Sequence, residues 1–160
     1  MADRDEYERV AQESLGALYK IALGMLRNGA DAQDAVQQAL LKAWEKTDTV
    51  KPGMMRWYLT RVLINECHNI QRSRMRSFPT DPEELPIAAQ TVSPDYRELY
   101  AAIEALPEKL RLPLYLKYLQ GASEKQGAMI LGSPVTTFKN RLFRARKELR
   151  NQLDREVMFE

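Results

Sequence analysis

Apolar residues recur at three- and four-residue spacing through most of the chain, which is the period of an amphipathic helix. The first such stretch predicts an amphipathic helix, in which the recurring positions are Val10, Ser14, Leu15, Leu18, Ile21, Ala22, Met25 and Leu26. We expect Asn28 and Gly29 to end this helix, because both residues tolerate the left-handed conformation that is common at helix ends. No alternation typical of β-strands and no internal repeat stands out, so the pattern predicts an all-α protein.

Two further helices are predicted in the N-terminal half, from about Asp31 to Glu45 and from about Met54 to Met75. Thr47–Gly53 between them is a predicted loop, because it contains the turn-forming pair Pro52-Gly53. The presumed core side of the third helix carries Met55, Leu59, Val62, Leu63, Glu66 and Ile70.

Phe78–Pro94 has a different character, since it is acidic, contains four prolines and has no helical period. Such a stretch is typical of an extended, flexible linker. Helical patterns resume after it, over Asp95–Ala105, Pro107–Leu119, Ser123–Leu131 and Pro134–Leu153. We therefore predict two small helical domains, residues 1–77 and 95–160, joined by a linker of residues 78–94.

The last two of these helices form a predicted helix-turn-helix, a short helix followed by a Gly132-Ser133 turn and a longer basic helix. At about 100° per residue, the core face of the longer helix is predicted to carry Val135, Phe138, Leu142, Ala145 and Leu149. The opposite face carries Thr136, Lys139, Asn140, Phe143, Arg144 and Lys147. Such side chains can contact phosphates and base edges, and Phe143 can contact a thymine methyl group. Alternatively, Phe143 packs on a neighbouring helix.

The third helix has a comparable face, formed by Trp57, Arg61, Asn65, His68 and Arg72. An aromatic ring among cations and amides suits single-stranded DNA, where bases stack on rings and phosphates meet arginine. A solvated face whose Trp57 is buried by a domain partner explains the pattern equally well.

The formal net charge of +2 conceals two basic clusters separated by acidic residues. One cluster is Arg56, Arg61, Arg72, Arg74 and Arg76, and the other is Lys139, Arg141, Arg144, Arg146, Lys147 and Arg150. Two separated basic clusters indicate two contacts with a polyanion, although two solvated helix faces would give the same pattern.

Other features exclude several classes of function. A single cysteine, Cys67, rules out an internal disulfide framework and fits a reducing compartment. Cys67 and His68 are adjacent and point to different helix faces, so we expect no metal site. No nucleophile–base arrangement or glycine-rich phosphate loop is recognisable, so we expect neither an enzyme nor a cofactor. No secretory pattern or bilayer-length apolar run is present, which predicts a soluble, cytoplasmic protein.

Four stretches together resemble the extracytoplasmic-function (ECF) RNA polymerase sigma factors of bacteria, in that family's order and spacing. The stretches are DAQDAVQQALLKAW (31–44), WYLTRVLINECHNIQRSRMR (57–76), ALPEKLRLPLYLKYLQGAS (105–123) and LGSPVTTFKNRLFRARKELR (131–150). The resemblance implies an N-terminal domain that docks on core RNA polymerase and opens the −10 promoter element, and a C-terminal domain that reads the −35 element.

The resemblance also implies roles for individual residues. Core polymerase would meet Asp31, Asp34, Gln37, Gln38, Leu41 and Trp44. The −10 DNA would meet Trp57, Tyr58, Arg61, Asn65, His68 and Arg72, and the −35 DNA would meet the outward face of the helix-turn-helix. The Thr47–Gly53 loop would hold a flipped-out base. Members of the family are often held inactive by an anti-sigma protein, so such a partner is a candidate.

The sequence departs from the family pattern at several positions. Tyr58 stands where the family usually has Trp, and Asn69 replaces a usual Asp. Gln126-Gly127 replaces Glu-Ile, and glycine lowers helix stability by about 1 kcal/mol. Pro113 lies inside a predicted helix and should kink it. The changes at Pro113, Gln126 and Gly127 predict a less stable C-terminal domain.

Two other functions remain open at this point. A polymerase-independent helix-turn-helix regulator would explain the C-terminal half, but it has no need of the stretch from Asp31 to Trp44. A helical interaction protein would leave both basic faces unexplained.

Overall fold

The structure, a computed structural model, describes residues 3–76 and 97–159, with side chains up to Leu153. The chain divides into two compact units, Met1–Glu84 and Leu85–Glu160. The described residues form seven helices and no strand, which confirms the predicted all-α fold. The predicted linker, Phe78–Pro94, lies outside the described residues.

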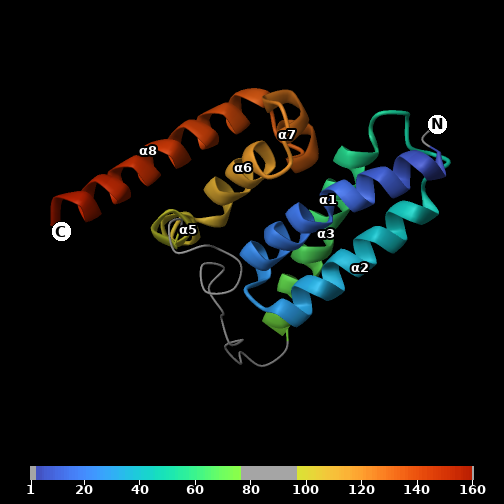
Figure 1. Ribbon diagram of the computed structural model, residues 1–160, viewed down its shortest axis with the longest axis horizontal. Helices are drawn as coiled ribbons and strands as arrows, with labels where there is room; N and C mark the ends of the chain where they lie inside the picture. Colours follow the sequence, from blue (N-terminus) through green and yellow to red (C-terminus); the bar gives the residue numbers. More distant parts are fainter. Residues whose placement is uncertain (1–2, 77–96, 160) are drawn as a thin grey trace. The chain divides into compact units, whose positions relative to one another are not determined.

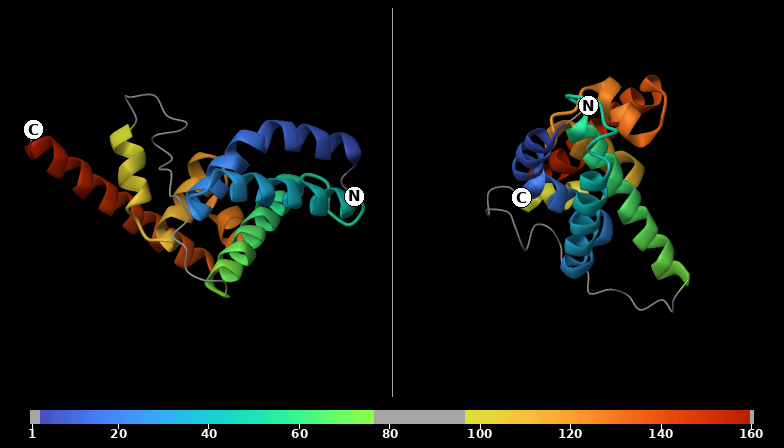
Figure 2. Two further views of the ribbon diagram at one scale, coloured as in Figure 1. Left: turned by 90° about the horizontal axis from the view of Figure 1, so that it is seen from below. Right: turned by 90° about the vertical axis from the view of Figure 1, so that its right-hand side faces the viewer.

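The N-terminal unit contains three helices, each of which contacts the other two: α1 (Arg4–Leu26), α2 (Gly29–Glu45) and α3 (Met55–Arg76) (Figures 1 and 2). Their apolar stripes meet in a common core, as expected for helices that each have one apolar side. Leu18 of α1, Ala39 of α2 and Leu63 of α3 are fully buried there. The three predicted helices are therefore confirmed, and their ends lie within two residues of the predicted ones.

The turn between α1 and α2 differs from the sequence prediction. Arg27, not Asn28 or Gly29, takes the left-handed conformation, with φ of +57°, and its N–H bonds to the Leu23 carbonyl. Asn28 instead caps α2, because its side-chain oxygen accepts a hydrogen bond from the Asp31 N–H at 3.0 Å. The break between the two helices lies within two residues of the expected place, but the expected left-handed conformation at Asn28-Gly29 was wrong, because the side chain of Asn28 caps the next helix.

The buried face of α3 is rotated from the predicted one. Thr60, Ile64 and Cys67 are buried, whereas Val62, Glu66 and Ile70 are only partly buried. The reason is that α3 contacts both α1 and α2, so two adjoining sides of this helix are covered. Thr60 tolerates burial because its hydroxyl donates to the Arg56 carbonyl at 2.7 Å. In α1, Leu15 shares the apolar period of the buried residues but is 49% exposed.

The C-terminal unit consists of α5 (Arg97–Glu104), α6 (Glu108–Tyr118), α7 (Glu124–Leu131) and α8 (Val135–Phe159), and the three shorter helices all pack on α8. Phe138, Leu142 and Ala145 form the buried face of α8, as predicted. Val135 is 38% exposed, so its assignment to the core was wrong. It is the first residue of α8, where the preceding turn leaves its side chain uncovered.

Residues that depart from the family pattern are accommodated in the C-terminal unit. Ser123 and Gln126 form a reciprocal capping box at the start of α7, at 2.9 and 3.1 Å, so Gln126 serves the helix end. The ring of Phe138 occupies the space that a side chain at Gly127 would need. The core side chain missing at Gly127 is therefore replaced from α8. Pro113 is buried within α6, which continues through it to Tyr118.

Candidate polymerase and nucleic-acid interfaces

One surface of α2 combines polar and apolar side chains. Asp34, Gln37, Gln38 and Leu41 are exposed, and Leu41 keeps 53% of its area in solvent. They lie opposite the buried alanines of the same helix, Ala32, Ala35, Ala39 and Ala43. The exposed residues Asp34, Gln37, Gln38 and Leu41, together with Trp44, are called the α2 surface below. It has the mixed character of a protein-docking face, since polar groups give specificity and Leu41 gives apolar area.

Asp31, which was predicted for the same interface, has an intramolecular partner. The Nε–H of Arg74 donates to its carboxylate at 3.1 Å, and the same guanidinium donates to the Leu26 carbonyl at 2.8 Å. Arg74 thus ties the end of α3 to the α1–α2 turn. Asp31 therefore has a clear structural role, whereas Asp34, Gln37, Gln38 and Leu41 are exposed on the side of α2 that faces away from the core.

Trp44 is held by the first turns of α1. Tyr7 packs edge-on against its indole, with ring centroids 5.2 Å apart, and the guanidinium carbon of Arg4 lies 5.1 Å from the indole centroid. The Tyr7 hydroxyl donates to the Leu40 carbonyl at 2.7 Å, and burial raises the pKa of this hydroxyl. The sequence analysis missed these contacts, although the aromatic Tyr7 just before the first apolar stripe was a signal for them.

Contacts near both of its ends hold the loop between α2 and α3. Thr47 and Val50 are buried, and the Thr47 hydroxyl donates to the Trp44 carbonyl at 3.0 Å. Further on, Gly53 has φ of +82° and donates its N–H to Glu6 Oε1 at 2.7 Å. The positive φ explains the glycine, because other residues strain in that conformation.

The outward face of α3 carries the residues predicted for −10 DNA. Arg61, Asn65 and Arg72 are exposed, while Trp57, Tyr58 and His68 are half-buried. This face lies opposite the buried positions of the helix. Trp57 thus keeps part of its ring accessible within its own unit, which stacking on a base requires.

The first basic cluster is divided between two roles. Arg56 donates to the Ser14 hydroxyl at 3.0 Å and to the Glu13 carboxylate at 2.6 Å, which satisfies the fully buried Ser14. Arg74 is tied to the α1–α2 turn, as described above. The cluster therefore presents Arg61, Arg72 and Arg76 as its exposed charges.

The outward face of α8 contains all six residues predicted for −35 DNA, and all six are exposed: Thr136, Lys139, Asn140, Phe143, Arg144 and Lys147. We call them the α8 surface. Phe143 is 67% exposed, so it does not pack on a neighbouring helix of its unit. Lys139 forms an ion pair with Glu124 at the start of α7, with Nζ and Oε2 3.5 Å apart.

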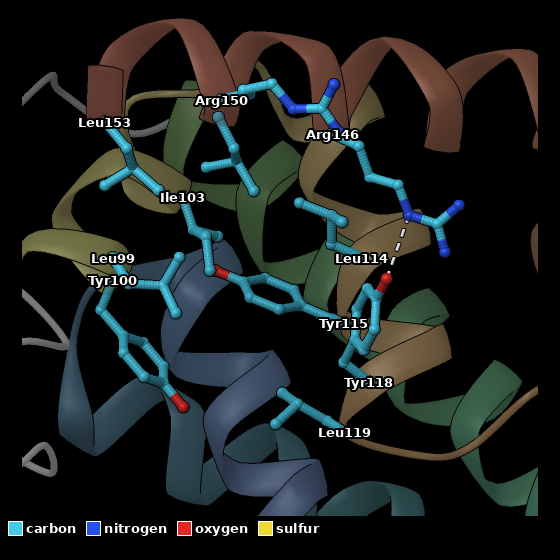
Figure 3. Close-up of a pocket in the computed structure, with 11 residues that line it drawn as sticks. Leu99, Tyr100, Ile103, Leu114, Tyr115, Tyr118, Leu119, Arg146, Arg150 and Leu153 are labelled. Carbon is cyan, nitrogen blue, oxygen red and sulfur yellow. Dashed lines mark hydrogen bonds between the residues drawn. The ribbon is translucent and has the colours of Figure 1, made fainter. Parts of the chain in front are cut away.

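The C-terminal unit also contains an apolar cavity of about 550 Å³ between α5, α6 and α8. Leu99 and Ile103 of α5, Leu114 of α6 and Leu153 of α8 line it (Figure 3). At its rim, Arg146 Nε donates to the Tyr118 hydroxyl at 3.0 Å. The periodic pattern did not predict this cavity, because the pattern shows which residues face inward but not how completely their side chains fill the space.

The described residues contain no cluster of three or more histidine, cysteine or acidic side chains suited to a metal ion. None of the helices in the described ranges has the length and apolar character needed to cross a membrane.

Comparison with known proteins decides the family. The family model described as Sigma-70 region 2 matches residues 10–77, and the one described as Sigma-70, region 4 matches residues 96–149. The ECF RNA polymerase sigma factor EcfG of Rhodopseudomonas palustris is 32% identical over 142 residues, which cover 83% of this chain and 77% of EcfG. The chain belongs to the ECF sigma factors. It is a sigma factor that directs promoter-specific transcription, and its family consists of non-enzymatic initiation factors.

Further comparisons agree with this assignment. RNA polymerase sigma factor SigV of Bacillus subtilis is 26% identical over 141 residues, covering 86% of this sigma factor and 85% of SigV. Among solved structures, the sigma factor RpoE of Bartonella quintana, in complex with the anti-sigma factor NepR, superposes with a TM-score of 0.77 at 29% identity. That match covers 93% of this chain and 97% of RpoE. The region 2 match also disfavours the polymerase-independent regulator, which has no use for residues 10–77.

Proposed function

We propose that this sigma factor divides its work among three surfaces. The α2 surface docks on core RNA polymerase, the outward face of α3 with the loop before it engages −10 DNA, and the α8 surface reads −35 DNA. Residues 1–77 and 95–160 are then the two functional domains. The chain itself catalyses no reaction, and it acts in the cytoplasm with the polymerase.

The observation that supports this proposal is that each surface has exposed side chains. The packing of the helices does not require this exposure. Leu41 and Phe143 are 53% and 67% exposed, and each lies among exposed polar side chains of its surface, which is the arrangement of an apolar centre and a polar rim found in binding faces. Arg61, Asn65 and Arg72 form a polar, cationic strip on α3 beside the partly accessible Trp57. Each of these surfaces lies within a stretch that a family model matches.

We also propose that an anti-sigma protein binds this chain. The solved relative RpoE is held by the anti-sigma factor NepR, and the match to RpoE covers both units of this chain. An anti-sigma protein that covers the α2 surface would compete with core polymerase.

One set of variants of the full chain tests the three assignments against one another. Asp34→Ala with Gln38→Ala should weaken co-elution with core polymerase. Asn65→Ala should weaken binding of the assembled holoenzyme to single-stranded −10 DNA, and Arg144→Ala its binding to −35 duplex. Each variant serves as the control for the other two. Unchanged binding at its own step, or equal losses at all three steps, would remove that variant's assignment.

A further inference from the structure

Glu6 lies on the first turn of α1, before residue 10, where the region 2 match begins. Its backbone N–H bonds to the side chain of the helix cap Asp3 at 2.8 Å, which fixes the start of the helix. Its carboxylate then reaches across the unit and accepts the Gly53 N–H at 2.7 Å, a contact between residues 47 positions apart. The bond is exposed to solvent, so its net contribution is that of an ordinary protein hydrogen bond.

The two halves of the loop between α2 and α3 are held differently. In the first half, Thr47 and Val50 are buried, and the turn bonds of Thr49 and Val50 both end on the Lys46 carbonyl. In the second half, residues 51–53 are exposed, and the Met54 N–H donates to the Lys51 carbonyl at 3.1 Å. The Glu6–Gly53 bond therefore acts on the half of the loop that burial does not fix.

From this geometry we propose that Glu6 is a positioning residue for promoter recognition: its carboxylate holds Gly53, and thereby the second half of the loop, in the shape that receives an extruded −10 base. The inference rests on the proposed role of this loop in −10 recognition. An extruded base gains its binding free energy from a preformed pocket, so disorder in the loop costs the preferred base more than the others. Loss of this hydrogen bond should therefore reduce base preference.

The test uses the full chain assembled with core polymerase, and a −10 library randomised behind a fixed −35 element. Glu6→Ala should reduce the preference at one −10 position by roughly two- to tenfold, the range of one net hydrogen bond, and leave the other positions unchanged. Glu6→Gln keeps an acceptor oxygen and should retain most of the preference. Glu8→Ala, which removes an exposed carboxylate from the same helix, should match the wild type.

Several results would overturn the proposal. One is a wild-type preference profile for Glu6→Ala. Another is an equal change at every position in Glu6→Ala, Glu6→Gln and Glu8→Ala, which would indicate a general effect of charge. Weaker core binding by Glu6→Ala would show that the first turn of α1 acts through Trp44 instead. Absence of any −10 preference in the wild type is a separate result, because it would refute the proposed role of the loop itself.

Discussion

Lys139 and Arg144 are both exposed cations on α8, but their chemistry predicts different effects on promoter binding. A lysine suits a phosphate contact, so Lys139→Ala should lower affinity for all sequences and flatten the salt dependence. An arginine can bond two base-edge acceptors at once, a contact that discriminates by about 1–3 kcal/mol. Arg144→Ala should therefore relax preference at one or two −35 positions.

Binding of both variants across a randomised −35 library at fixed salt separates these cases. If Arg144→Ala weakens every sequence equally, Arg144 contacts a phosphate and does not read a base.

The ion pair between Glu124 and Lys139 competes with DNA for the same cation. Glu124→Gln should raise DNA affinity by at most about fivefold, because exposed ion pairs contribute up to about 1 kcal/mol. The increase should disappear in the Lys139→Ala background and shrink at high salt. Glu148→Gln, which removes an exposed carboxylate on α8, is the matched control. An increase that persists without Lys139 would show that Glu124 acts on the overall field and not through this pair.

At this scale, the sequence pattern predicted the outward faces well and the partners of individual residues poorly. All six residues of the α8 surface are exposed as expected, because helical periodicity separates two opposite sides of one helix. Periodicity could not show that Asp31 bonds to Arg74, or that Glu6 reaches Gly53, since those bonds join residues 43 and 47 positions apart.

At the scale of elements, the packing of α7 against α8 depends on Gly127 and Phe138 together. A methyl group at Gly127 would overlap the ring of Phe138, which is fully buried and cannot swing out. Gly127→Ala should therefore destabilise the C-terminal unit by up to about 2 kcal/mol, since overpacking costs about 1–3 kcal/mol and alanine recovers about 1 kcal/mol of helix propensity.

A double-mutant cycle with Phe138→Leu, followed by denaturant unfolding, measures this coupling. The smaller side chain makes room for the methyl group, so the double variant should lose less stability than the sum of the two single variants. Strict additivity, or a stabilising effect of Gly127→Ala, would contradict this account of the packing.

The contact between Gly127 and Phe138 also explains why the expected effect of Gly127 on the C-terminal domain was incomplete. Counted by itself, Gly127 removes a core side chain and weakens a helix. The compensation comes from Phe138, eleven residues away on another helix, and local propensity contains no information about it. The helices themselves were predictable, because the apolar stripe of each one is continuous, whereas the buried face of α3 depends on contacts with two other helices at once.

At the scale of the whole molecule, the described residues form two units that carry different surfaces: α2 and α3 belong to one, and α8 belongs to the other. Such a division suits a protein that must contact polymerase and two separated promoter elements. The change of composition after residue 77 is the feature of the sequence that predicts two domains. How strongly each surface binds depends on the partners, which the periodic pattern does not describe.

The central claim is that this chain gives core RNA polymerase its promoter choice through these surfaces. The most direct measurement is transcription in vitro by purified bacterial core polymerase from a library of promoter fragments, with and without the full chain. We predict transcripts that start at a restricted set of promoters when the chain is present, and that are lost with Asp34→Ala and Gln38→Ala. Transcripts from the same fragments with and without the chain, while the chain still binds DNA, would contradict the account.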